Sequence, residues 1–161
     1  MTKRDREMIC EGVLKRWRKL QEEVWKVEDD AANVAFSQGG EPVQSSSISD
    51  KTARGAFMLE SVDEKKKWIE VITEAMDWLE EERPDIQRLL YGHYGMRHLR
   101  GYKRKYAKAF TESYCKVYGI SRAEYFNRRV EGLDEIAYYA TEKGLLNCKQ
   151  FNPQLNHKKR W

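Results

Sequence analysis

Residues 114–126 read Tyr-Cys-Lys-Val-Tyr-Gly-Ile-Ser-Arg-Ala-Glu-Tyr-Phe, and this stretch decides the fold of the C-terminal part of the chain. Gly119 stands where a helix must end and the chain must turn, because glycine adopts a left-handed backbone conformation at little cost. Ser121 is a favourable N-cap for a second helix. Cys115, four residues before the glycine, is small enough for the two helices to approach closely. The stretch therefore predicts a helix-turn-helix.

The flanking sequence supplies the two helices. Upstream, a helix over about residues 103–118 is expected to bury the face that carries Tyr106, Phe110, Tyr114 and Val117. Downstream, a helix over about 121–143 is expected to end at Gly144. Its predicted buried stripe has spacings of four and three residues, as an amphipathic helix requires. This stripe consists of Phe126, Val130, Leu133, Ala137 and Ala140.

Charge is distributed unevenly along the chain. Residues 97–129 contain ten Lys or Arg and two acids, a net charge of +8, whereas residues 60–85 contain ten acids and four bases, a net charge of −6. Such asymmetry favours a basic face for nucleic acid and an acidic part that faces elsewhere. The basic segment coincides with the predicted helix-turn-helix, which indicates a DNA-binding function.

The two kinds of DNA contact are expected from different residues. The N-terminal half of the second helix enters the major groove in such motifs, where Arg pairs with guanine, Asn with adenine and Glu with cytosine. We therefore expect base contacts from Arg122, Glu124, Asn127 and Arg128. We expect phosphate contacts from Lys103, Arg104, Lys105, Lys108, Ser121 and Arg129. The alternative is an ordinary helical hairpin whose basic residues form a solvated face.

The N-terminal third predicts one long helix over about residues 2–37. Apolar residues recur every three or four positions in a heptad seam: Val13, Trp17, Leu20, Val24, Val27, Ala31 and Val34. Such a seam faces a partner helix. The partner is either another helix of the same chain, which we favour, or a second subunit in a homodimer. The Gly/Pro/Ser-rich residues 38–47 then indicate a linker, either a surface loop or a hinge.

The middle of the chain predicts acidic helices. A short helix is expected from about Ser49 to Leu59. Ser61 and Glu64 have the spacing of a capping box, so a helix is expected from there to about Glu82. Its apolar stripe is Trp68, Ile72, Ala75 and Leu79. Pro84 suits the first turn of the next helix, because the N–H group that proline lacks has no partner there.

These patterns predict an all-α chain in four segments. They are a heptad-patterned helix and linker over 1–50, acidic central helices over 51–95, a basic helix-turn-helix region over 96–147 and a basic tail over 148–161. No run of 18 apolar residues and no signal-peptide pattern is present, so we expect no membrane contact and a cytoplasmic location. The three cysteines form no disulfide framework, and the three histidines have no metal-ligand spacing. No catalytic motif or cofactor is expected, and the chain is not expected to be an enzyme.

One stretch also resembles a known family. The run from Gly119 to Arg129, followed by Leu133, Ile136 and Ala137, resembles phage late transcription regulators of the ArpU and RinA types, which are similar to the fourth region of sigma factors. Ile120-Ser121, Tyr125-Phe126 and Arg128-Arg129 match the family's pattern, and the match covers about residues 114–140. The chain departs from the family by about ten additional residues between Tyr94 and the helix-turn-helix.

The resemblance implies binding to a promoter-like site in double-stranded DNA and activation of late phage genes with RNA polymerase in the bacterial host cell. Two other readings of the sequence remain open. One is a DNA-packaging component similar to a small terminase subunit, which forms a ring. The other is a protein–protein adaptor that acts through its heptad-patterned helices and has no role on DNA.

Overall fold

The computed structural model describes residues 1–36, 54–56, 59–98 and 100–147, and within them every regular element is a helix. This confirms the all-α fold class. The helices are α1 (Lys3–Lys15), α2 (Trp17–Phe36), α4 (Asp63–Glu82), α5 (Pro84–His93), α6 (Arg104–Tyr118) and α7 (Arg122–Glu142). None of the described helices is long and apolar enough to span a membrane. The predicted linker over 38–47, most of the short helix over 49–59 and the tail over 148–161 lie outside the described residues.

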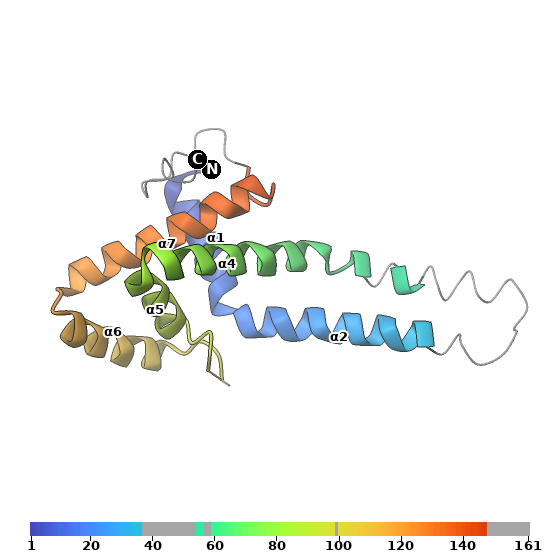
Figure 1. Ribbon diagram of the computed structural model, residues 1–161, viewed down its shortest axis with the longest axis horizontal. Coiled ribbons are helices and arrows are strands. Elements are labelled where there is room, and N and C mark those ends of the chain that lie inside the picture. The colour runs from blue at the N-terminus through green and yellow to red at the C-terminus, as the bar shows by residue number, and fades with distance from the viewer. Residues whose placement is uncertain (37–53, 57–58, 99, 148–161) are drawn as a thin grey trace, which may run out of the picture.

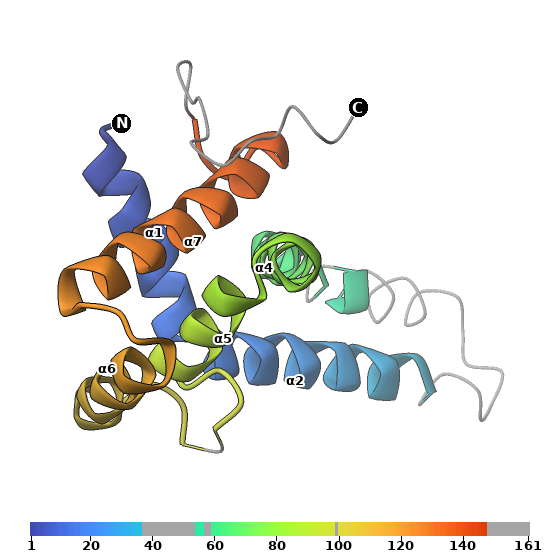
Figure 2. The ribbon, with the colours of Figure 1, turned by 60° about the vertical axis from the view of Figure 1, so that its left-hand side comes forward.

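One hydrophobic core joins α1, α4, α5, α6 and α7. Helix α7 lies at its centre and packs against α1, α4, α5 and α6 (Figures 1 and 2). The largest fully buried side chains include Tyr94, Tyr125, Leu89, Leu133 and Ile136. The predicted DNA-binding region therefore shares its core with the N-terminal and central segments, so those three segments do not have separate cores.

The prediction of one long N-terminal helix was wrong. The helix is interrupted at Arg16, and α1 and α2 run in different directions (Figure 1). Helix α1 packs on α7, whereas α2 packs on α4. A straight helix cannot follow both surfaces, so tertiary packing breaks it although no proline or glycine stands at this position.

Four of the seven residues of the heptad seam are nevertheless buried within the chain, and Leu20, Val27 and Val34 are half-buried. Val13, Trp17, Val24 and Ala31 are each at most 9% exposed. The ion pair between Lys65 Nζ and Glu23 Oε2, 2.7 Å apart, joins α4 to α2 beside this seam. The favoured prediction, that the seam packs inside the chain, agrees with this arrangement.

Two predicted details of the helices also need correction. The N-cap of α4 is Val62 and not the predicted Ser61: the helix begins at Asp63, and the Val62 side chain makes no capping hydrogen bond. The Val62 side chain is 2% exposed and is therefore buried at the start of the helix. On α6, Tyr106 and Val117 are 52% and 79% exposed rather than buried.

The buried side of α6 carries Ala107, Thr111 and Tyr114 instead. The predicted face was therefore correct at Tyr114, correct in part at the half-buried Phe110, and wrong at Tyr106 and Val117. The expected stripe of α4 is buried as predicted, and Val71 and Met76 are buried beside it. Pro84 occupies the first turn of α5, also as predicted.

Candidate nucleic-acid interface

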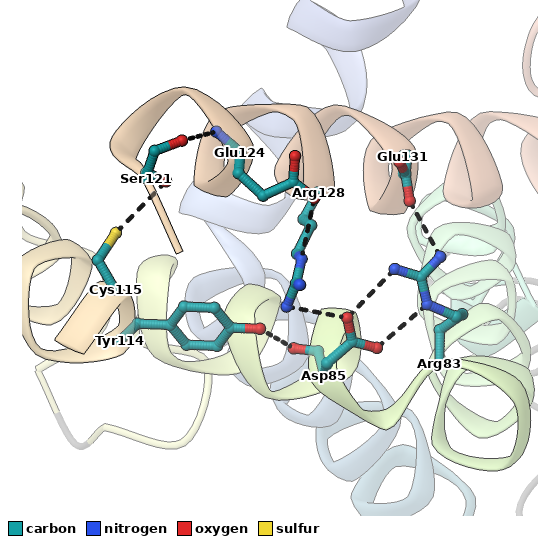
Figure 3. Close-up of polar contacts among 8 residues, drawn as sticks. All are labelled: Arg83, Asp85, Tyr114, Cys115, Ser121, Glu124, Arg128 and Glu131. Atoms are coloured by element: carbon teal, nitrogen blue, oxygen red, sulfur yellow. Dashed lines mark hydrogen bonds and ion pairs between the residues drawn. The ribbon is translucent and has the colours of Figure 1, made fainter. Parts of the chain in front are cut away.

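The turn between α6 and α7 consists of Gly119, Ile120 and Ser121. Gly119 has φ 62° and ψ 36°, the left-handed conformation that ends α6. The Ser121 hydroxyl accepts a hydrogen bond from the N–H of Glu124 at 3.1 Å and so caps α7 (Figure 3). The Cys115 thiol lies 3.8 Å from the carbonyl oxygen of Ser121, so this small side chain contacts the turn. The local geometry predicted from residues 114–126 is confirmed.

Helices α5, α6 and α7 pack against one another around this turn. The Tyr114 hydroxyl donates a hydrogen bond to the carbonyl oxygen of Asp85 at 2.7 Å, which fixes α6 on α5. Close approach is also required at Gly92 of α5, where the ring of Phe110 occupies the space that a Cβ atom would need. Figures 1 and 2 show that α7 diverges from α6 after the turn, so the N-terminal end of α7 is not covered by α6.

An ion-pair network fixes α7 on α5. Asp85 accepts two hydrogen bonds from Arg83, and its Oδ2 lies 3.2 Å from Arg128 Nη1 of α7 (Figure 3). Arg83 also donates to Glu131 at 3.2 Å. Burial alone would raise the pKa of Asp85, but the hydrogen bonds from Arg83 and the charges of Arg83 and Arg128 hold it below its ordinary value. Asp85 therefore remains ionised and pairs with both guanidinium groups.

Arg128 was predicted to read bases, but the structure commits it to this network. Its side chain is 18% exposed and has a second carboxylate, Glu124, 3.5 Å from its Nε. Arg129 was predicted to contact phosphate, and its Nη1 lies 2.9 Å from Glu11 Oε1 of α1, with the Tyr94 hydroxyl at 3.4 Å. Both arginines stabilise the position of α7 within the chain, and we omit them from the candidate interface.

The other predicted base-contacting residues are exposed on the first turns of α7. Arg122, Glu124 and Asn127 all face solvent. Arg122 lies 5.7 Å from the centre of the Phe126 ring, and among the described residues it forms no ion pair with a carboxylate. Glu124 pairs with Arg128 but is 49% exposed. The Arg122 guanidinium and the Asn127 amide are therefore available for contacts at the exposed N-terminal end of α7.

The predicted phosphate-contacting side chains gather at the start of α6. Lys103, Arg104, Lys105 and Lys108 are exposed, and within the described part of the chain none of them pairs with an acid. The first turn of α6 contains no acidic residue and no capping side chain. The positive charge of these four side chains is therefore not neutralised by an acidic group in the described part of the chain. Ser121, the other predicted phosphate contact, uses its hydroxyl oxygen to cap α7 and remains exposed.

A buried polar pair supports α7 from beneath. His93 Nδ1 lies 2.8 Å from the Tyr125 hydroxyl, and both side chains are buried. Burial, with a smaller contribution from the positive charge of Arg129, lowers the pKa of His93 to about 4. Burial also raises the pKa of Tyr125 to about 12. Both rings are therefore neutral near pH 7, and their contact joins α5 to α7.

Sequence reasoning missed the residues that hold α7 in place. Arg83, Asp85 and Glu131 carry no motif, and no signal in the sequence links α5 to α7. Among the described residues, no group of three or more His, Cys, Asp or Glu side chains is arranged to hold a metal ion. Comparisons of the chain with protein-family models, with curated proteins and with solved structures found no match.

Proposed function

We propose that this protein is a sequence-specific DNA-binding regulator that inserts the N-terminal end of α7 into the major groove. One observation carries the proposal: the basic residues are divided into two groups. Arg128 and Arg129 form ion pairs with Asp85 and Glu11. In contrast, Arg122 and the Lys and Arg side chains at the start of α6 have no acidic partner among the described residues. Uncompensated positive charge at the start of α6 and at the N-terminal end of α7 favours a polyanion as the partner.

In this proposal the exposed residues have separate roles. Arg122 and Asn127 read base edges, because their side chains present the donors and acceptors that guanine and adenine match. Lys103, Arg104, Lys105 and Lys108 bind phosphates and orient the protein on the duplex. Glu124 is available to cytosine only if it leaves Arg128.

The finer role rests on the resemblance of residues 114–140 to phage late transcription regulators. We propose that the bound protein activates transcription with RNA polymerase in a bacterial host. The outer face of α4 offers a surface for a protein partner, because Asp77, Glu80, Glu81 and Glu82 are exposed there. We do not propose a homodimer through the heptad seam, since the chain itself buries four of its seven residues.

The test is to select genomic fragments with purified protein and measure binding of the recovered duplex across a salt series. Tight binding that is selective over random DNA and falls steeply with salt supports the proposal. The Arg122→Ala/Asn127→Ala variant is expected to lose the selectivity, whereas Lys26→Ala on the exposed side of α2 is expected to bind as the wild type does. Absence of binding at low salt would overturn the proposal and favour a protein–protein adaptor.

Molar mass in solution separates the regulator from a packaging component. A monomer or dimer by light scattering agrees with the regulator. A ring of about eight or more subunits would contradict it and support a small-terminase-like role.

A further inference from the structure

A basic cavity lies between the end of α5 and the start of α6. It has a volume of about 530 Å³ and is lined by Arg97, His98, Arg100, Gly101 and Tyr106. Its lining residues precede α6 or lie in the first turn of that helix, so the cavity is at the end of α6 opposite the turn that precedes α7. None of its lining residues is acidic, and none was assigned a role above.

The loop that forms the cavity is held by specific contacts. The His98 N–H donates to the Gly95 carbonyl and the Gly101 N–H donates to the His98 carbonyl, both at 3.0 Å. Arg18 of α2 donates to the His98 carbonyl at 3.2 Å. The His98 and Tyr106 rings are stacked with an interplanar angle of 8°. The backbone at His98 and Gly101 and the ring of His98 are therefore held in a defined position.

Two arginines give this cavity its charge. Arg97 and Arg100 are exposed, and neither pairs with an acid among the described residues. The Arg97 guanidinium lies 4.1 Å from the centre of the Tyr91 ring, which restricts its position without neutralising it. Arg97 also borders a neighbouring cavity that contains Glu80, but no ion pair joins the two side chains. A restricted guanidinium is suited to bidentate contact with phosphate.

We infer that Arg97 and Arg100 bind the phosphate backbone of double-stranded DNA beyond the bases read by α7. The inference rests on the proposed function and extends it. The loop leads directly into the exposed Lys and Arg residues at the start of α6, so the positive surface runs from α6 into the cavity. The 15 residues of α6 span about 22 Å. The phosphates bound here therefore differ from those beside the N-terminus of α7, and the contact lengthens the DNA site without adding base specificity.

The experiment measures binding of the Arg97→Ala/Arg100→Ala variant to the selected duplex and to a random duplex. The matched control, Lys26→Ala/Lys67→Ala, removes the same charge from the exposed sides of α2 and α4. Each arginine that contacts a phosphate should contribute about 0.9 to the slope of log affinity against log salt. The variant should therefore lose up to about 1.8 of that slope on both duplexes and keep the wild-type preference between them, while the control keeps the wild-type slope.

Site-specific methylphosphonates, which remove one phosphate charge at a time, identify the position of the contact. Methylphosphonates at the edge of the DNA site should weaken DNA binding by the wild type and have no effect on DNA binding by the variant. The inference would be overturned if the variant kept the wild-type salt slope and the wild-type response to the methylphosphonates. The proposed function would then remain intact. The inference would also be overturned if the variant bound single-stranded DNA more weakly than the wild type but bound both duplexes as the wild type does. Arg100→Ala tests the same point without disturbing the Arg97–Tyr91 contact, should the double variant fold poorly.

Discussion

Arg128 Nη1 lies 3.2 Å from Asp85 Oδ2, and this ion pair fixes the N-terminal half of α7 on α5. The Arg128 side chain is 18% exposed and that of Asp85 is 22% exposed. The pair therefore lies mostly out of water, where removal of one partner leaves the other incompletely satisfied. Its role is to position the candidate recognition helix.

Replacement of Arg128 should consequently affect stability more than base preference. We expect Arg128→Ala to lower the free energy of unfolding by about 1–2 kcal/mol, since Asp85 loses one of its two arginine partners. Arg122→Ala, which removes an exposed arginine from the same helix, should change it by less than about 0.5 kcal/mol. Denaturant titration of both variants measures the difference. A double-mutant cycle with Asp85→Ala should show coupling, and additive effects would contradict this account of the pair.

The exposed residues of α7 and α6 should behave differently on DNA. Arg122→Ala is expected to lower affinity for the selected duplex by about 1–3 kcal/mol and to relax preference at one base pair. Lys105→Ala is expected to weaken binding about equally on any duplex and to reduce the salt slope by about one. Fluorescence anisotropy with selected and random duplexes measures both. If the two variants behave alike, the division into base-reading and phosphate-binding residues is wrong.

Acid should destabilise the protein through His93. The pKa of this side chain is about 4 in the folded protein, against 6.5 as its ordinary value. Between these values the unfolded chain binds the proton and the folded chain does not, so the contribution to stability is complete above about pH 6.5 and lost as the pH falls toward 4. The expected loss is about 3 kcal/mol. The His93→Gln variant has no titratable group at this position, so its free energy of unfolding should change less than that of the wild type over this pH range.

The control for that experiment is Tyr125→Phe, which removes the hydroxyl beside His93 Nδ1 but leaves the imidazole buried. This variant is expected to retain most of the pH dependence. A His93→Gln protein with the full wild-type dependence would show that other groups cause the acid sensitivity.

Helix α5 depends on a close contact at Gly92. An added Cβ atom would overlap the Phe110 ring of α6, so Gly92→Ala should lower the free energy of unfolding by about 1–3 kcal/mol. Gly12→Ala is the matched control: a Cβ at Gly12 of α1 meets no atom within 4 Å. That variant should gain up to about 1 kcal/mol, because alanine favours a helix. Thermal unfolding measures both, and Phe110→Leu should partly rescue Gly92→Ala. Equal stabilisation by the two alanines would contradict the contact.

Local features of the fold were predictable because neighbouring residues determine them. Gly119 ends α6, Ser121 caps α7 and Pro84 opens α5, as the sequence indicated. Each depends on backbone conformation or on a hydrogen bond across a few residues. The heptad seam was recognisable for a similar reason, because apolar spacing determines which side of a helix is buried. The break at Arg16 was not predictable, since it arises from two different packing partners.

The sequence by itself determined an all-α chain with a helix–glycine–helix turn inside a basic segment, because these features depend on composition and short-range pattern. Only the tertiary structure decided which basic side chains remain available. Arg122, Arg128 and Arg129 belong to the same helix and have the same charge, yet only Arg122 is left without an acidic partner among the described residues. The partners of the other two, Asp85 and Glu11, are brought beside α7 by the packing of α5 and α1, contacts that local sequence does not encode.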